Sequence, residues 1–218
     1  DIINFCNQKF YNNELIILTQ KDGDESPLMI YKTVPGNHAR KNPHWSGLYN
    51  QREIDEIIDM VEELTTNSIG VITPYRYQAN LLNDKLSLIN PSIEADTVHK
   101  FQGRAKDIII LSTVANDIIT GDTNDDKKED FVSRSDLLNV AISRAKKQLR
   151  IVVSDKVFNS KNNSIADLIK YIRYNSLNSS IKYGKVSSIF DILYSDYQSE
   201  YKKFRSKQKK QGYATEQL

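Results

Sequence analysis

The chain has 218 residues, of which 39% are hydrophobic and 9% aromatic, so it can bury a core and is not disordered as a whole. Lys and Arg (30) nearly balance Asp and Glu (28), so a nucleic acid would have to meet a local basic patch and not a global positive field. The single cysteine excludes an internal disulfide and a cysteine-based zinc site, and no apolar run approaches the roughly 20 residues of a membrane span, so we expect a cytoplasmic protein without a metal site or membrane contact.

The first third of the chain predicts a helix, two strands and a second helix. It opens directly on a helix-like stretch at residues 3–12, so we expect it to be part of a longer protein. The β-branched and aliphatic runs LIILT (15–19) and LMIYKTV (28–34) are typical of strands. Residues 35–49 show no periodicity, and residues 51–67 then place one apolar stripe on an amphipathic helix.

The middle of the chain repeats a unit of strand, turn and helix. IGVIT (69–73) is an almost wholly apolar strand, and the helix after it is predicted to open with Pro74 at its first position. DIIILSTV (107–114) and LRIVVS (149–154) are further continuous apolar strands. Strands that are apolar on both faces and alternate with helices predict a mostly parallel sheet flanked by helices, so the fold class is α/β.

The remaining segments complete this organisation. DLLNVAISRAKK is helical by pattern, with Ser135 or Asp136 as its cap, and the acidic segment 116–135 ahead of it predicts a solvated insertion. The C-terminal part contains two helix-like runs, IADLIKYIRY and VSSIFDILYSDYQSEYKKF, and a basic tail. We expect one domain over residues 1–158 and a helical extension over residues 159–218.

TPYRYQ, directly after the strand at 69–73, is the first of three polar clusters that we expect near strand or helix junctions at the carboxyl ends of strands, where open parallel sheets bind ligands. Thr73 supplies a hydroxyl, Tyr75 an aromatic face and Arg76 a guanidinium, a set that suits a phosphate backbone and a stacked base. A helix N-terminus capped by Thr73, with the tyrosines packed, explains the same residues equally well.

TVHKFQGR is the second cluster. Thr97 and His99 supply donors to phosphate oxygens. Gly103 lets the backbone approach a ligand closely, and Arg104 supplies a charge-assisted fork. Taken alone, these residues are more often a strand, a turn and a solvated arginine with no ligand.

LNVAISRAK is the third cluster. On a helix, Asn139, Ser143 and Arg144 would stand on a face away from the apolar residues, which exposes one arginine beside the sheet. A trans-acting arginine finger requires such an arginine, but a simple surface arginine is commoner and spacing does not decide between them. The pattern GxxxxGK[ST] is absent, so the chain has no phosphate-cradling P-loop.

In this order, GVITPYRYQ, TVHKFQGRAKDIIILSTV and LLNVAISRAKKQLRIVV closely resemble motifs IV, V and VI of superfamily 1 helicases, in the branch of the nonsense-mediated-decay helicases and their bacterial relatives. The resemblance covers residues 69–154 and implies the second of two RecA-like motor domains. ATP and Mg²⁺ would be held mainly by the absent N-terminal motor domain, so the fragment would be inactive alone. The implied partner is single-stranded nucleic acid, by analogy DNA, with 5′ to 3′ polarity.

The resemblance also implies roles for individual residues. Arg144 matches the arginine finger of motif VI, and Arg104, beside Gly103, matches the basic residue of motif V near the nucleotide. The expected single-strand contacts are Thr73, Tyr75, Arg76, Thr97 and His99. Where the family usually has Glu after QGR, this chain has Ala105, so we expect weaker sugar discrimination. The competing hypothesis is a nucleic-acid-binding or partner-recruiting relic of a helicase that does not hydrolyse ATP.

Overall fold

The computed structural model describes residues 2–17, 26–34, 39–41, 47–66, 68–114, 134–154, 157–158, 164–175 and 180–184. The helices of these residues are α1 (Ile2–Phe10), α2 (Gln51–Glu62), α3 (Arg76–Ile89), α4 (Ser135–Ile142) and α6 (Ser164–Asn175). Their strands are β1 (Leu28–Lys32), β2 (Ala39–Lys41), β3 (Leu48–Asn50), β4 (Ile69–Thr73), β5 (Glu94–Thr97), β6 (Lys106–Ser112), β7 (Ala145–Val153) and β8 (Ile181–Tyr183). The predicted acidic insertion at 117–130, the helix predicted from residue 186 and the basic tail lie outside the described residues.

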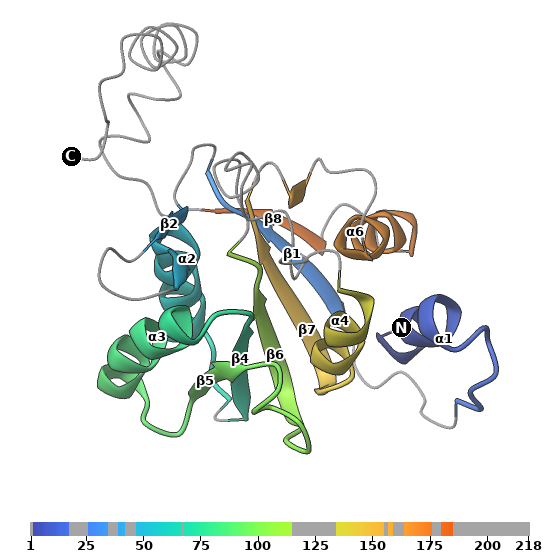
Figure 1. Cartoon of the computed structure of the whole chain (residues 1–218), viewed down its shortest axis with the longest axis horizontal. Coiled ribbons are helices and arrows are strands. Elements are labelled where there is room, and N and C mark those ends of the chain that lie inside the picture. The colour runs from blue at the N-terminus through green and yellow to red at the C-terminus, as the bar shows by residue number, and fades with distance from the viewer. Residues whose placement is uncertain are drawn as a thin grey trace, which may run out of the picture.

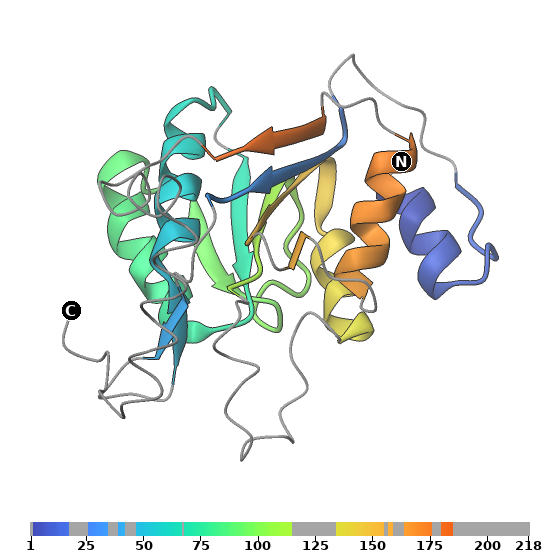
Figure 2. The same cartoon turned by 90° about the horizontal axis from the view of Figure 1, so that it is seen from above.

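Six strands form one sheet in the order β5-β4-β6-β7-β1-β8, and each neighbouring pair in it is parallel (Figures 1 and 2). Helices connect β4 to β5 and β6 to β7, so the predicted α/β class with a mostly parallel sheet is confirmed. A short antiparallel pair, β2 with β3, stands apart from this sheet. This pair was not predicted, because it lies in and beside the segment 35–49, which shows no periodicity.

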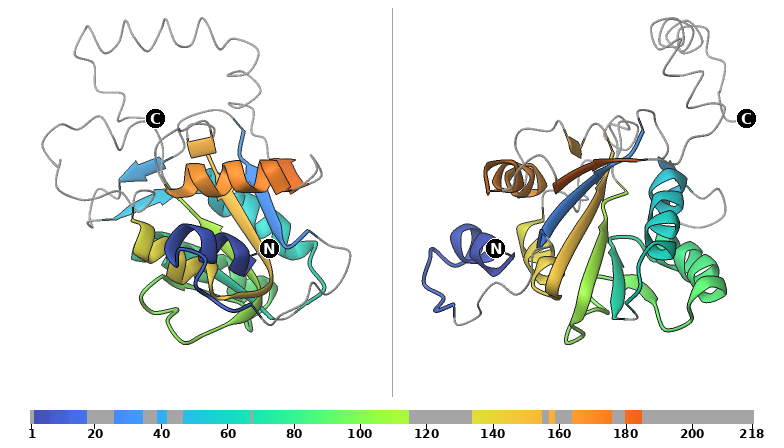
Figure 3. Two further views of the ribbon diagram at one scale, coloured as in Figure 1. Left: turned by 90° about the vertical axis from the view of Figure 1, so that its right-hand side faces the viewer. Right: turned by 180° about the vertical axis from the view of Figure 1, so that it is seen from behind.

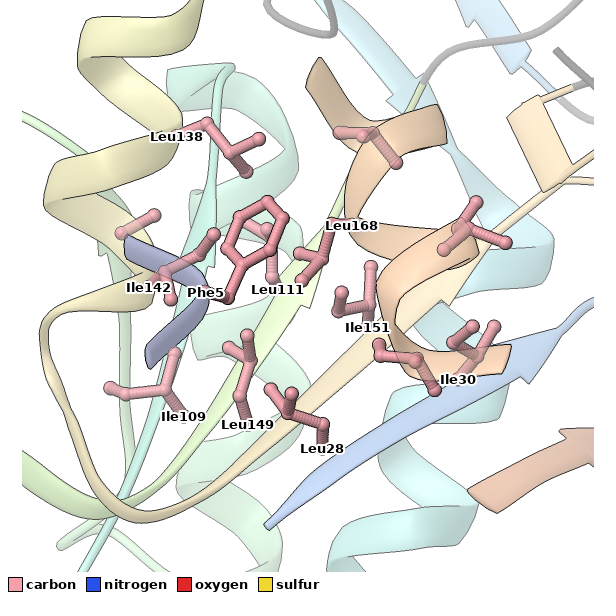
Figure 4. Packing of buried hydrophobic residues seen from close by; sticks show 14 of the residues in the cluster. Phe5, Leu28, Ile30, Ile109, Leu111, Leu138, Ile142, Leu149, Ile151 and Leu168 are labelled. Carbon is pink, nitrogen blue, oxygen red and sulfur yellow. The ribbon is translucent and has the colours of Figure 1, made fainter. Parts of the chain in front are cut away.

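Helices cover both faces of the sheet, as continuous apolar strands require (Figure 3). In β6, Ile109 and Leu111 pack in the cluster under α1, α4 and α6, whereas Ile108 and Ile110 pack in the cluster under α2 and α3. Figure 4 shows the first cluster, in which Phe5, Leu138, Ile142 and Leu168 of the helices meet Leu28, Ile30, Ile109, Leu111, Leu149 and Ile151 of the strands. Burial on both faces fixes the strands, and with them the positions of their ends.

Three predicted helix boundaries are wrong. The helix after β4 begins at Arg76 with Tyr75 as its N-cap, and not at Pro74. The helix α4 is preceded by Arg134 as N-cap, and neither Ser135 nor Asp136 caps it. It ends at Ile142, because the backbone from Ala145 on pairs with β6 as strand β7.

The strand predicted at LIILT (15–19) is also wrong for its described residues. Leu15, Ile16 and Ile17 are in no strand. The Leu15 N–H donates to Asn7 Oδ1 at 2.9 Å, and Ile16 is 87% exposed, so this part of the run is irregular chain whose first residue is held by the side chain of Asn7 in α1. β1, by contrast, lies within the predicted run at 28–34.

The described part of the predicted C-terminal extension adds to the same sheet and core. Ile165, Leu168, Ile169 and Ile172 of α6 are buried in the first cluster, and β8 pairs with β1. No helix among the described residues is long and apolar enough to cross a membrane.

Candidate functional site

All strands of a parallel sheet begin at one edge and end at the other. The amino edge is defined here by the strand starts Ile69, Glu94, Lys106 and Ala145. The carboxyl edge is defined by the strand ends Thr73, Thr97, Ser112 and Val153. The predicted site residues divide between these two edges. The prediction that the polar clusters lie near the carboxyl ends of strands is therefore wrong for Arg104 and Arg144, which lie just before the starts of β6 and β7.

The segment 98–105 carries the chain from the carboxyl edge, at the end of β5, back to the amino edge, at the start of β6. Its anchor is Phe101, which is fully buried. The Thr97 carbonyl accepts the N–H groups of Lys100 and Phe101, which forms a helical turn at the start of the segment. A Cβ on Gly70 would lie 2.7 Å from Phe101 Cζ, so a glycine in β4 makes room for the ring.

Gly103 and Arg104 follow this anchor at the amino edge. Gly103 has φ +78°, a conformation that side chains other than glycine's rarely adopt, and no atom lies within 4 Å of the place a Cβ would take. Backbone conformation and not crowding therefore calls for glycine here. The Arg104 guanidinium is 3.0 Å from Glu94 Oε2 and lies 5.9 Å from the ring centroid of Phe101, on an exposed side chain.

Arg144 lies in the turn between α4 and β7, also at the amino edge. The Arg144 carbonyl accepts the N–H of Lys106 at 3.1 Å, so Arg144 lies beside the start of β6. Arg104 lies two residues before that same strand start. Ser143, the C-cap of α4, accepts a hydrogen bond from Arg144 Nη2 at 3.0 Å. The Arg144 Nε is buried and has no hydrogen-bond partner. Arg144 is therefore held by a strand start and not, as predicted, by a helix face.

A buried guanidinium N–H without a hydrogen-bond acceptor, such as that of Arg144 Nε, is suited to bind an anionic ligand. Desolvating such a donor costs free energy unless an acceptor meets it, and phosphate oxygens are strong acceptors for arginine. Arg104 and Arg144 both lie at the amino edge, each within two residues of the start of its strand. No group of three or more His, Cys, Asp or Glu side chains that could hold a metal occurs among the described residues.

The other predicted contacts gather at the carboxyl edge. Arg76 opens α3, with its Nη1 2.6 Å from Asp96 Oδ1 and its Nη2 3.3 Å from Thr97 Oγ1. Tyr75 is partly exposed and His99 is exposed in the turn after β5. The β4 and β5 ends lie side by side, since Thr73 pairs with Thr97 in the parallel register. Arg76, Thr97 and His99 therefore form one surface with Tyr75.

Thr73 differs from the rest of this group. Its side chain is fully buried, and its hydroxyl oxygen has no hydrogen-bond partner. A ligand could reach that hydroxyl only if neighbouring side chains moved. Its predicted strand contact stays a prediction, and the helix-capping alternative does not apply because Tyr75 is the N-cap.

A buried polar cluster beneath the carboxyl edge was not predicted from the sequence. Glu53 of α2 is fully buried and hydrogen-bonded to Ser112, Thr113 and Val114 at the end of β6. Gln78 of α3 donates to Ser112 Oγ at 2.9 Å. Glu53 stood outside the apolar stripe of its helix, so periodicity placed it toward solvent. Burial raises the pKa of its carboxyl to about 7, against hydrogen bonds that lower it.

A family model described as an AAA domain, AAA_12, matches residues 1–156. The chain is 31% identical over 179 residues to the "Probable RNA helicase armi" of Drosophila melanogaster, which covers 69% of this chain and 15% of that protein. It is 29% identical over 184 residues to an uncharacterized ATP-dependent helicase of Methanocaldococcus jannaschii, which covers 72% of this chain and 26% of that protein.

The chain is also 39% identical over 113 residues to the DNA polymerase alpha-associated DNA helicase A of Saccharomyces cerevisiae, with 48% of this chain and 15% of that protein covered. A solved structure, described as the C-terminal domain of a possible DNA helicase from Lactobacillus plantarum WCFS1, covers 84% of this chain and 94% of that chain, with a TM-score of 0.47 and 13% identity. The matched region spans between 15% and 26% of the length of the three helicases.

Proposed function

This chain belongs to the AAA_12 family of AAA domains and is a RecA-like domain of the superfamily 1 helicases, and on that basis we propose that it is the second motor domain of an ATP-dependent helicase or translocase. The observation that carries the proposal is the division of the site between two edges. Two arginines with the chemistry for a triphosphate lie at the amino edge. A surface with the chemistry for a nucleic-acid strand lies at the carboxyl edge.

At the amino edge, Arg144 is the arginine finger. Its buried, unpartnered Nε and its Nη atoms are placed by the turn that β7 holds against β6, so little ordering is required when a phosphate arrives. Positive charge there stabilises the negative charge that builds on the phosphoryl oxygens during transfer. Arg104, next to Gly103, is a second cation for the nucleotide, and it would exchange its exposed contact with Glu94 for that ligand.

ATP with Mg²⁺ is held mainly by a first motor domain that carries a P-loop, because the sequence of this chain has none. The chain alone therefore does not turn over ATP. Domain closure brings Arg144 to the nucleotide, and reopening follows hydrolysis. The part played by this chain is to present a fixed cation at the interface, and not to hold the substrate.

At the carboxyl edge, the strand contacts are Tyr75, Arg76, Thr97 and His99, and Thr73 would join them only after a movement of the side chains that bury it. Hydroxyl, imidazole and guanidinium donors suit phosphate oxygens, and the Tyr75 ring suits a stacked base. Arg76 is pre-oriented by Asp96, so its geometry is fixed before a strand binds. The named relatives include an RNA helicase and a DNA helicase, and we propose DNA as the strand.

The segment 98–105 links the two edges. It begins at the carboxyl edge with Thr97 and His99, is anchored by Phe101, and ends at the amino edge with Arg104. A shift of this segment on strand binding would therefore move a nucleotide contact. This is the physical route by which a strand would stimulate ATP turnover.

The test is single-strand-stimulated ATP turnover by the full-length protein, with Arg144→Ala compared with wild type. Arginine fingers contribute about 10³-fold or more to turnover, so we expect a loss of that order with ATP affinity nearly unchanged. The matched control is Arg173→Ala, which removes an exposed arginine on α6 and should leave turnover within about twofold of wild type. Turnover by Arg144→Ala equal to that of the control would refute the arginine-finger role. Wild-type protein that binds a strand but never hydrolyses ATP would support the alternative of a binding relic.

A further inference from the structure

Glu53 is a buried acid that the proposed motor mechanism does not use. Its Oε2 accepts from Ser112 Oγ at 2.6 Å and from the Val114 N–H at 2.9 Å. Its Oε1 accepts from Thr113 Oγ1 at 3.1 Å and from Asn50 Nδ2 at 3.4 Å. The side chain is fully buried, so this one carboxyl organises the end of β6 from beneath.

The cluster also holds the first turn of α3. Ser112 Oγ accepts from Gln78 Nε2 at 2.9 Å while it donates to Glu53, so the hydroxyl is a bridge between the two side chains. Gln78 Oε1 accepts the Asn50 N–H at 2.8 Å, which closes a ring through the start of α2. The starts of α2 and α3 and the end of β6 are thereby fixed to one another.

Val114 shows that this arrangement holds the backbone against its preference. Its φ is +60°, in the left-handed region, and it is fully buried. A β-branched residue is strained in that region, so this conformation persists only where the surroundings over-determine it. The hydrogen bond from Val114 N–H to Glu53 is the contact that pins this conformation.

The same cluster lies under the proposed strand contacts. Gln78 stands two residues after Arg76 in the first turn of α3, whose N-cap is Tyr75, and the Tyr75 carbonyl accepts the Ala79 N–H. Arg76 in turn contacts Asp96 and Thr97 at the end of β5. Side-chain hydrogen bonds and one helical turn therefore connect Glu53 to the carboxyl edge.

We propose that Glu53 is the positioning residue of the single-strand surface: its carboxylate fixes Val114 and, through Ser112 and Gln78, the turn that presents Tyr75 and Arg76. This inference rests on the proposed function, and it adds a residue that contacts neither strand nor nucleotide. The expected consequence is that loss of the carboxylate weakens strand binding and leaves strand-independent properties of the nucleotide site unchanged.

The charge of Glu53 matters for this role. Among the described residues, its hydrogen-bond partners are the amide of Asn50 at the N-cap of α2 and the hydroxyls and N–H of β6 and the segment after it. Through Ser112 they include an amide on α3, and none of these groups is charged. The charged side chains beside it on α2 are Arg52, Asp55 and Glu56. The backbone N–H of Val114 can only donate, so a protonated Glu53 would hold it with a neutral hydrogen bond, about half as strong as the charge-assisted one. Burial raises the pKa of this carboxyl to about 7, so this change falls within a range of pH that experiments can reach.

The test uses the full-length protein and a fluorescently labelled oligothymidine, with the dissociation constant measured from pH 6 to pH 8.5. Wild type, Glu53→Gln and the matched control Glu62→Gln, an exposed carboxyl on the same helix, are compared. At pH 8, Glu53→Gln should bind about fivefold more weakly, the worth of about one hydrogen bond, and the control should match wild type. The ratio of the two constants should shrink toward one as pH falls through 7. His99, at the same edge, is present in all three proteins and cancels from the ratio.

A Glu53→Gln protein whose affinity equals wild type at every pH overturns the inference. So does an affinity loss that is the same at every pH, because that marks a general structural defect. Ser112→Ala is the second variant, since it removes the hydroxyl that bridges Gln78 and Glu53 and keeps the carboxylate. It should also weaken oligothymidine binding. If Glu53→Gln fails to fold, an affinity of Ser112→Ala equal to wild type overturns the inference. Failure of the proposed function looks different, because wild type itself would then not bind the oligonucleotide or turn over ATP.

Discussion

At the scale of single residues, the structure separates side chains that are poised for ligands from side chains that only look so in the sequence. Arg144 has a buried, unused donor, whereas Arg76 is held by Asp96 and Arg104 by Glu94. Thr73 is buried although the sequence predicts a contact with a strand. Surface ion pairs contribute little to stability, so the pairs of Arg76 and Arg104 do not prevent them from binding phosphate.

Glu53 makes stability depend on pH in an unusual direction for an acid. Its pKa is raised to about 7 in the folded protein, so between its ordinary value of 4.5 and 7 the folded state binds more protons than the unfolded state. The free energy of unfolding should therefore fall as pH rises through this window, by about 2–3 kcal/mol relative to Glu53→Gln. Urea unfolding of both proteins at pH 5 and pH 8 measures it. A difference between the two proteins that does not change with pH would contradict this prediction.

Cys6 is expected to be an unreactive thiol. It is fully buried in α1, and burial raises its pKa to about 11, so almost no thiolate is present at neutral pH. Iodoacetamide at pH 7.5 should modify it only after denaturant unfolds the protein. Labelling of the native protein at the rate of a free cysteine peptide would show that α1 opens readily.

At the scale of elements, apolar pattern predicted the sheet well and its polar connections poorly. The strands β1, β4, β6 and β7 and the helix α2 follow from continuous or periodic apolar runs, because burial on both faces leaves no other place for them. The end of α4 was mispredicted because pairing with β6, a long-range contact, outweighs the helical propensity of the residues around Arg144. β2 and β3 were missed for a related reason: three-residue strands have no period to detect.

The residues of the candidate site were named from the sequence, but their arrangement was not. The motif resemblance named Arg144, Arg104 and His99, but nothing in the spacing places the first two at one edge of the sheet and the third toward the other. The hydrogen bonds of Glu53 to β6 were not predicted, because a local sequence pattern suggests another partner for its carboxylate. Asn50 and Glu53 have the spacing of a capping box, in which the acid would bond the backbone N–H of Asn50; Gln78 takes that N–H instead and frees the carboxylate for β6.

The segment 98–105 should depend on Phe101 more than on any of its polar residues. Phe101→Ala removes a fully buried ring and should lower the free energy of unfolding by about 3–5 kcal/mol. Gly70→Ala places a methyl group 2.7 Å from the same ring and should displace it without removing it, with a smaller loss. Chemical denaturation measures both. Equal stability of Phe101→Ala and wild type would mean that the segment is not anchored as described.

Gly103 gives a conformational test of the same segment. Gly103→Ala adds a methyl group into open space but must adopt φ +78°, so it should cost about 1–2 kcal/mol. Gly103→Asn adds a larger side chain yet tolerates the left-handed region, so it should cost less. A smaller loss for Ala than for Asn would point to crowding and against the backbone argument. Thermal melting of the two variants gives the order.

At the scale of the whole molecule, the two proposed ligand sites lie at opposite edges of the parallel sheet, one made of strand starts and the other of strand ends. Among the described residues, two connections bring arginines of the proposed nucleotide site to the amino edge. They are the segment 98–105, with Arg104, and the turn that contains Arg144. The central claim is therefore that changes at one edge affect nucleotide chemistry and changes at the other affect strand affinity.

The measurement that tests this claim most directly compares Arg144→Ala with Tyr75→Ala in the full-length protein. For each, strand-stimulated ATP turnover at saturating oligothymidine and the dissociation constant for that oligonucleotide are determined. Arg144→Ala should lose turnover by about 10³-fold with strand affinity unchanged. Tyr75→Ala should weaken strand binding by about 5- to 100-fold, the worth of one stacked base, and recover turnover when the strand is saturating. Two variants that lose both properties in parallel would contradict the assignment of separate edges.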